Sequence, residues 1–167
     1  MLYPSCNQTL TDTIVDMQLL SQITTRIRLY GSDCNQTALV LEAIKQTKTN
    51  IKVFPAIYVV ENDEVGYQRQ RSALQQALQN YGTDNVLGII VGDEFLLNYA
   101  IEHNATGANS TVGLAASAIL KGKIADIRQM LTSMNITLHV GTSEAGSFFN
   151  VDLLGAVDFG CAYIFDF

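Results

Sequence analysis

Basic charge is scarce in this sequence and is nowhere clustered. The 167 residues include 10 Lys and Arg against 16 Asp and Glu, which gives a net charge of -6. Arg69 and Arg71 come closest to forming a patch, and a solvated helix face accounts for them. Because proteins that bind nucleic acids need clustered cations to neutralise phosphates, the sequence predicts no nucleic-acid partner.

Four other signals are absent. No apolar run reaches the roughly 18 residues that a membrane-spanning helix requires, so no membrane span is predicted. The N-terminus shows neither the basic region nor the apolar core of a signal peptide. Residues 31–34 lack the G-x-G-x-x-G pattern of nucleotide-binding folds, and His103 and His139 lack the spacing of metal ligands. We therefore expect neither a cofactor nor a bound metal.

Apolar residues, in contrast, are abundant. They make up 48% of the chain, and only 16% of the residues are charged. This composition is typical of a folded globular domain and not of a disordered segment. Because no internal linker, repeat or low-complexity tract interrupts the chain, residues 1–167 are expected to form one domain with a sizeable core.

Helical and extended patterns alternate along the chain. Helices are expected at 11–21, 36–46, 65–81, 95–102, 111–134 and 146–154, and strands at 24–30, 51–60, 85–91, 137–140 and 157–164. Residues 2–4 suggest the tail of one more strand. Strands separated by helices pair in parallel through right-handed crossovers, which defines an α/β fold. The pattern leaves an open doubly wound sheet and a partial barrel equally open, since a complete barrel needs about 250 residues.

Glycosylation sequons and cysteines suggest an extracellular origin. Five sequons begin at Asn7, Asn35, Asn104, Asn109 and Asn135. Cys6 and Cys34 both lie beside polar, loop-like residues, whereas free cysteines prefer apolar burial. We expect a Cys6–Cys34 disulfide that contributes about 3–4 kcal/mol in a secreted protein, and we interpret Cys161 as a core thiol. These features favour a secreted ancestry, with a leader that is missing from this chain.

The segment from Gly88 to Asn98 contains the clearest candidate site. A β-branched run ends in Gly92-Asp93-Glu94 and a helical pattern follows, as expected for a buried parallel strand with two carboxylates at its C-terminal end. In barrels of alternating strands and helices, this end carries the active site. The residues alone leave simpler roles open, because Glu94 can form an ion pair and Asp93 can cap the next helix.

Four segments resemble, in order, the motifs of one enzyme family. They are residues 26–36 (RIRLYGSDCNQ), 91–95 (VGDEF), 141–150 (GTSEAGSFFN) and 156–160 (AVDFG). These segments are similar to the second-, fourth-, fifth- and sixth-strand motifs of fungal glycoside hydrolase family 17. The family comprises β-1,3-glucanases and glucan transglycosylases of the cell wall. The resemblance implies a (β/α)8 TIM barrel, of which this chain would hold about the first five to six βα units.

The resemblance also implies roles for individual residues. Glu94 takes the position of the general acid/base, the carboxyl that protonates the leaving oxygen and then activates water or an acceptor sugar. The candidate substrate-binding residues are Asp93, Tyr30, Asp33, Tyr58 and Glu144. The two tyrosines can stack on sugar rings, or equally pack the mouth of the barrel.

The chain departs from the family pattern at three points. Asp93 stands where the family has Asn, and Glu144 where it usually has Asp. An ionised Asp93 cannot donate a hydrogen bond to a sugar hydroxyl and adds a negative charge beside Glu94, so we expect this exchange to lower activity. The chain also has no Trp and no Glu-Thr-Gly-Trp-Pro-like segment, which holds the family's nucleophile on the seventh strand. No residue here inherits that role.

We therefore expect one incomplete TIM-barrel domain that acts on β-1,3-glucan by retaining hydrolysis or transglycosylation. Its expected location is secreted or in the cell wall, and without a nucleophile the chain is expected to be inactive alone. The alternatives are a non-catalytic glucan-binding or cell-wall protein and a gene fragment without function. The open sheet edges of an incomplete barrel also predict self-association.

Overall fold

The structure of the chain, a computed structural model, describes residues 4–163. Its helices are α1 (Leu10–Leu20), α2 (Gln36–Thr47), α3 (Glu64–Tyr81), α4 (Phe95–Glu102), α5 (Thr111–Ser133) and α6 (Val151–Leu154). Its strands are β1 (Arg26–Arg28), β2 (Lys52–Phe54), β3 (Ala56–Ile57), β4 (Ile89–Asp93), β5 (Val140–Ala145) and β6 (Gly160–Tyr163). Short 3-10 turns, η1 (Asp33–Asn35) and η2 (Gly146–Phe148), follow β1 and β5.

All the paired strands run parallel, which confirms the predicted α/β class. β1 pairs with β2, and β3, β4, β5 and β6 form a second ladder in that order. Pro55 separates β2 from β3, since proline has no N–H to donate to a ladder. Leu29 donates to the carbonyl of Phe54 on one side of the break, and Ile90 donates to the carbonyl of Pro55 on the other, both at 2.9 Å. β2 and β3 thus act as one interrupted strand, within the single strand that the sequence predicted at 51–60.

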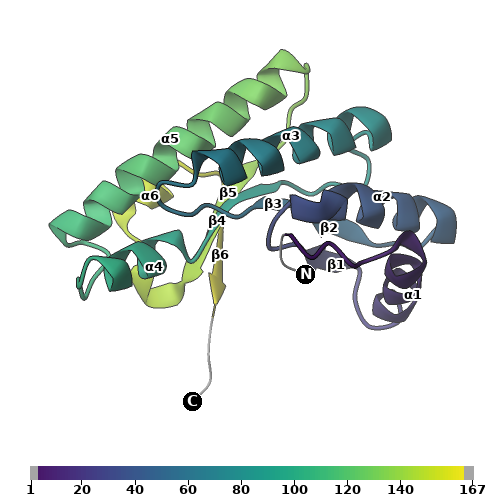
Figure 1. Cartoon of the computed structure of the whole chain (residues 1–167), viewed down its shortest axis with the longest axis horizontal. Coiled ribbons are helices and arrows are strands. Elements are labelled where there is room, and N and C mark those ends of the chain that lie inside the picture. The colour runs from purple at the N-terminus through teal and green to yellow at the C-terminus, as the bar shows by residue number, and fades with distance from the viewer. Residues whose placement is uncertain (1–3, 164–167) are drawn as a thin grey trace.

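Helices α2, α3 and α5 lie side by side along the strands (Figure 1). Tyr67 and Arg71 of α3 both donate hydrogen bonds to Asp126 of α5, at 2.7 and 2.8 Å. The core fills the space between these helices and the strands, and its fully buried side chains include Ile44, Leu74, Ile89, Leu120 and Ile127. Within residues 4–163, no helix has both the length and the apolar character that crossing a bilayer requires.

The strand array is strongly curved. If β2 and β3 count as one strand, β1 and β6 are four strand spacings apart, or about 19 Å in a flat sheet. Yet Arg28 on β1 donates a hydrogen bond to the hydroxyl of Tyr163 on β6. The rings of Phe54 and Phe159 also approach to 5.4 Å between centroids. The strands therefore bend around an inner face on which side chains from distant strands meet.

The fifth strand corrects one prediction from the sequence. A strand was expected at 137–140, but β5 begins at Val140 and continues to Ala145. Thr142, Ser143 and Glu144 resemble loop residues because they are polar, yet all three are buried and hydrogen-bonded. The helix expected at 146–154 is two short turns, η2 and α6. The expected strand tail at 2–4 falls largely outside the described residues, and so does Ile164 at the end of the last strand.

Cys6 and Cys34 form a disulfide with a Cα–Cα distance of 5.0 Å. The bond ties the segment before α1 to the loop after β1. Cys161, on β6, is a free and partly buried thiol, and burial raises its pKa.

Removing this disulfide is expected to lower the free energy of unfolding by about 3–4 kcal/mol. The bond joins residues 28 positions apart, and closing a loop of that length restricts the unfolded chain. Urea denaturation of a Cys6→Ser/Cys34→Ser variant, with Cys161→Ser as the control, measures the loss. A difference below about 1 kcal/mol between the double variant and the unmodified chain would contradict this prediction.

Candidate functional site

The turn after β4 places Glu94 at the centre of the candidate site. All five residues of β4 are buried, and α4 begins directly after Glu94. Glu94 adopts a left-handed backbone conformation, with φ of 53°. Gly92 also has a positive φ, and a Cβ there would lie only 2.8 Å from the side chain of Leu120. A left-handed glutamate costs about 1–3 kcal/mol, and strain of this kind concentrates at functional sites.

The Glu94 side chain is partly exposed and lies between two neighbouring strands. Its backbone N–H donates to the carbonyl of Ser143 on β5 at 2.9 Å, which fixes the turn. Its charge acts on Tyr58, which follows β3, and on Glu144 of β5. Among residues 4–163, no side chain is hydrogen-bonded to the Glu94 carboxylate. This carboxylate is therefore available to a ligand.

Asp93 lies beside Glu94 but is enclosed in a polar cluster of four strands. Arg28 Nη1 donates to Asp93 Oδ1 at 2.9 Å and to Ser143 Oγ at 2.7 Å, and the hydroxyl of Tyr163 donates to Asp93 Oδ1 at 2.5 Å. The guanidinium lies over the rings of Tyr30 and Tyr163, at 4.4 and 4.5 Å from their centroids. We call these five residues the Arg28 cluster.

The Arg28 cluster neutralises the charge of Asp93. Asp93 is only 7% exposed, and its Oδ1 has both a cation and a phenol as partners. Burial lowers the pKa of Arg28, but its bonds to Tyr163 and Asp93 outweigh burial and raise it overall. Burial and Asp93 raise the pKa of Tyr163, so that its hydroxyl remains a donor. The negative charge that the sequence places beside Glu94 is thus compensated within the fold.

Glu144 is completely buried, at 0% exposure. Its Oε1 accepts a hydrogen bond from the backbone N–H of Leu96, at 2.7 Å, whereas its Oε2 has no partner among the described residues. Burial raises the pKa of Glu144 to about 7; the N–H groups of Leu96 and Leu97 oppose this shift, and the charges of Glu94 and Asp93 add to it. Because the carboxyl reaches no surface, the role of a direct sugar ligand does not fit this position.

The other candidate residues surround the ends of the strands. Tyr30 and Tyr58 are 60% and 39% exposed, so both offer ring surface to a ligand. Asp33 instead uses both carboxylate oxygens to bind Arg69 of α3, at 2.7 and 3.1 Å. The roles of Tyr30, Tyr58 and Asp33 in binding sugar stay predictions.

Three members of the Arg28 cluster were not predicted as site residues: Arg28, Ser143 and Tyr163. In the strand expected at 24–30, side chains alternate between two faces, and Arg28 lies on the same face as Tyr30. This pattern could have identified Arg28 as a site residue. Ser143 and Tyr163 join the cluster through contacts that span 115 and 135 residues of sequence from Arg28. No local pattern reports contacts at such separations.

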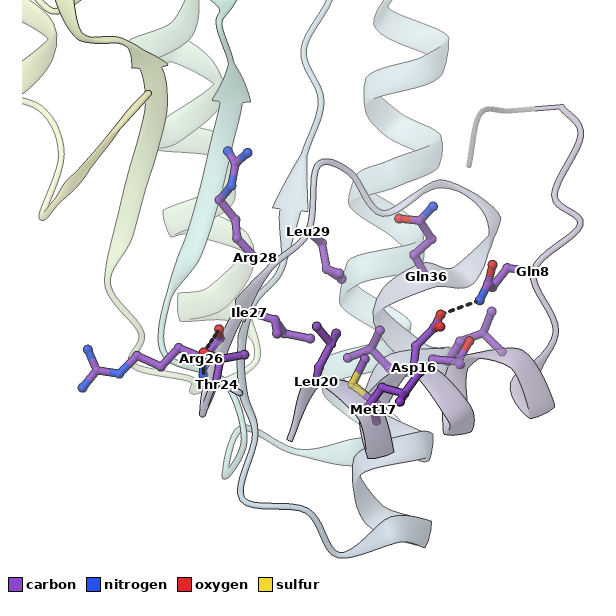
Figure 2. Close-up of a pocket in the computed structure, with 14 residues that line it drawn as sticks. Gln8, Asp16, Met17, Leu20, Thr24, Arg26, Ile27, Arg28, Leu29 and Gln36 are labelled. Carbon is purple, nitrogen blue, oxygen red and sulfur yellow. Dashed lines mark hydrogen bonds between the residues drawn. The ribbon is translucent and has the colours of Figure 1, made fainter. Parts of the chain in front are cut away.

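A cavity of about 650 Å³ lies elsewhere, between α1, β1 and α2. Its apolar lining includes Met17, Leu20, Ile27 and Leu29, while the Arg28 side chain points away from it toward the other strands (Figure 2). A smaller hollow of about 230 Å³, lined by Tyr58, Asn98, Tyr99 and Glu102 among others, lies beside the turn that carries Glu94. Within residues 4–163, no group of His, Cys, Asp and Glu side chains is arranged to hold a metal ion.

The sequence of the chain matches a known protein family and several of its members. The family model of the BtgE/BtgC glycoside hydrolase domain matches residues 3–167. The chain is 35% identical over 170 residues to a putative glucan endo-1,3-beta-glucosidase btgC of Aspergillus niger, covering 99% of this chain and 23% of that protein. It is 32% identical over 145 residues to the glucan endo-1,3-beta-glucosidase btgC of Emericella nidulans, covering 86% of this chain and 21% of that protein. The chain thus spans less than a quarter of the length of these relatives.

A solved structure shares the fold. It is a glycoside hydrolase family 17 beta-1,3-glucanosyltransferase from Rhizomucor miehei, which superposes with a TM-score of 0.68 at 21% identity. The match covers 92% of this chain and 50% of that chain. At this identity the likeness concerns the fold alone.

Proposed function

The chain belongs to the BtgE/BtgC glycoside hydrolase domain family, and from this premise we propose that it carries the general acid/base of a barrel that acts on β-1,3-glucan. The observation that supports this function best is Glu94, a partly exposed carboxylate on a strained turn at the C-terminal end of a buried parallel strand. The relatives named as endo-1,3-beta-glucosidases are more than four times as long as the matched region, which covers 23% and 21% of them. The proposed activity is therefore that of a full-length protein that contains this domain.

In the proposed reaction, Glu94 protonates the leaving oxygen and then acts as a base toward water or an acceptor sugar. A retaining reaction needs a second carboxyl, about 5–5.5 Å away, as nucleophile. Asp93 is bound by Arg28 and Tyr163, and Glu144 is buried against α4, so neither presents a free carboxylate to a sugar. We therefore assign the nucleophile to a residue outside 4–163, and we expect these residues alone to be inactive.

The curvature of the strands supports a partial (β/α)8 barrel over an open sheet. An open doubly wound sheet keeps its outermost strands far apart, whereas here Arg28 on β1 and Tyr163 on β6 are in contact. In a partial barrel the free edges of β1 and β6 need cover. In an isolated chain these edges would promote self-association.

Two features support a secreted or cell-wall location. The asparagines of all five sequons, Asn7, Asn35, Asn104, Asn109 and Asn135, are exposed. The Cys6–Cys34 disulfide fits an oxidising compartment. Both features are consistent with an extracellular protein that encounters the glucan of the cell wall.

The proposed function is tested with the full-length protein and β-1,3-linked glucose oligosaccharides. We expect cleavage or transfer with β-anomeric products formed first, as seen by proton NMR, and no turnover by residues 1–167 alone. First formation of the α-anomer, or cleavage restricted to a different glycan, would overturn the proposal. Binding of β-1,3-glucan without any cleavage would instead support a non-catalytic glucan-binding protein.

A further inference from the structure

Glu94 cannot both cap the start of α4 and act as a proton donor. Helices begin with N–H groups that lack partners within the helix, and the side chain of the N-cap residue usually accepts one of them. Glu94 is the N-cap of α4, but its side chain makes no capping hydrogen bond. A carboxylate that capped its own helix would be tied to the backbone and could not donate a proton to a sugar.

Glu144 provides the missing cap from the neighbouring strand. β4 and β5 are in register at Asp93 and Ser143, so Glu144 stands level with the turn at Glu94. Glu144 Oε1 accepts the N–H of Leu96, the second residue of α4, at 2.7 Å. The N–H of Leu97, the third residue, also stabilises the Glu144 carboxylate. These are the two amides that an N-cap side chain normally serves.

We infer that Glu144 is a positioning residue that caps α4 in place of Glu94 and so keeps the Glu94 carboxylate free for proton transfer. This inference rests on the proposed function, because it assigns the purpose of the cap to the acid/base role of Glu94. Nothing in the inference requires contact between Glu144 and substrate, which agrees with the complete burial of Glu144.

The protonation of Glu144 fits this role. The charges that act on Glu144 are those of Asp93 and Glu94. Arg28 and Tyr163 lie one step further away, since Arg28 is hydrogen-bonded to Ser143 and Tyr163 to Asp93. The enclosed Oε2 of Glu144 has no partner within residues 4–163 and disfavours a negative charge, and burial raises the pKa of Glu144 to about 7. A protonated carboxyl still accepts the Leu96 N–H through its carbonyl oxygen. The cap therefore depends on an acceptor oxygen at this place and not on the charge.

A matched pair of variants in the full-length protein tests the inference. Glu144→Gln keeps an acceptor oxygen at the same distance, whereas Glu144→Met has similar length and volume but no comparable acceptor. We expect Glu144→Gln to keep kcat on β-1,3-glucan within about threefold, since the amide oxygen accepts as the carboxyl does. We expect Glu144→Met to lower kcat about 10–100-fold with little change in KM, because a displaced turn misplaces Glu94.

Hydrogen exchange gives a readout that is independent of activity. Amide exchange of the peptide covering residues 94–98 is expected to quicken in Glu144→Met and to stay unchanged in Glu144→Gln. If Glu144→Met does not fold, Glu144→Asp replaces it, because Asp keeps a carboxyl group but is one methylene too short to reach Leu96. For Glu144→Asp we expect a lower kcat and faster exchange than for Glu144→Gln.

The outcomes separate the two proposals. Unchanged kcat and exchange in Glu144→Met, or an equal loss in Glu144→Gln and Glu144→Met, would overturn the inference. If the exchange at 94–98 responds as expected but Glu94→Gln leaves activity intact, the cap exists while the proposed function of Glu94 fails. In that case Glu144 still caps α4, but the inference that this cap serves proton transfer by Glu94 is overturned as well.

Discussion

In the full-length protein, Glu94→Gln is expected to lower kcat/KM on β-1,3-glucan by about 10²–10⁴-fold, the usual contribution of a general acid/base. Gln has nearly the same size as Glu but can neither donate an acidic proton nor accept one. The Glu94 side chain has no hydrogen-bonded side-chain partner in residues 4–163, so the exchange leaves the surrounding structure undisturbed. Initial rates of oligosaccharide cleavage and of transfer measure the loss.

The matched control for this variant is Glu64→Gln. Glu64 is an exposed glutamate at the start of α3, paired with Lys123 on the molecular surface. We expect full activity from Glu64→Gln and unchanged thermal unfolding from both variants, because surface exchanges usually stay within about 0.5 kcal/mol. A loss smaller than tenfold for Glu94→Gln, with the protein folded, would remove Glu94 from the reaction.

Helices α1 to α5 were predictable from sequence because their signals are local. The spacing of apolar residues predicted a helix at 95–102, and α4 has those bounds. The first helix begins and ends one residue earlier than predicted, and the long helix α5 ends one residue earlier. In each case a polar N-cap, Thr9 or Ser110, marks the start by accepting a backbone N–H. Such signals need no knowledge of the rest of the chain.

The polar interior was not predictable, because its partners come from distant parts of the chain. Glu144 resembles a loop residue or sugar ligand in the sequence, and only the position of α4 against β5 shows that it serves the Leu96 amide, 48 residues away. Asp93 likewise suggested an uncompensated charge beside Glu94. The curvature of the strands brings Arg28 to it across 65 residues. Sequence spacing gives the strand end on which these carboxyls stand, but not the groups that face them.

This compensation changes the expectation for Asp93. From the sequence, Asp in place of the family's Asn was expected to lower activity, partly by adding a negative charge next to Glu94. In the structure Asp93 is the ion-pair partner of Arg28 and accepts from Tyr163, so its charge is already balanced. Asp93→Asn would leave a mostly buried guanidinium without its carboxylate. The Arg28–Asp93 pair must therefore be tested as a unit.

Arg28→Met is expected to lower the free energy of unfolding by about 3–5 kcal/mol, the cost of leaving one partner of a buried ion pair behind. The Arg28 and Asp93 side chains are largely buried, and Arg28 also bonds Ser143 and Tyr163. The same guanidinium connects β1 to β4, β5 and β6, so its loss also weakens the curvature of the strand array. Urea denaturation followed by circular dichroism measures the change.

Arg26→Met is the matched control, because Arg26 lies on the same strand two residues away and is exposed. We expect its effect to stay within about 0.5 kcal/mol. In the double variant Arg28→Met/Asp93→Asn, the buried charge is gone, so we expect part of the lost stability to return. A double variant less stable than Arg28→Met alone would show that Asp93 stabilises the fold through Tyr163 rather than through the ion pair. An Arg28→Met variant as stable as Arg26→Met would mean that the contacts of Arg28 do not hold β1 against β4, β5 and β6.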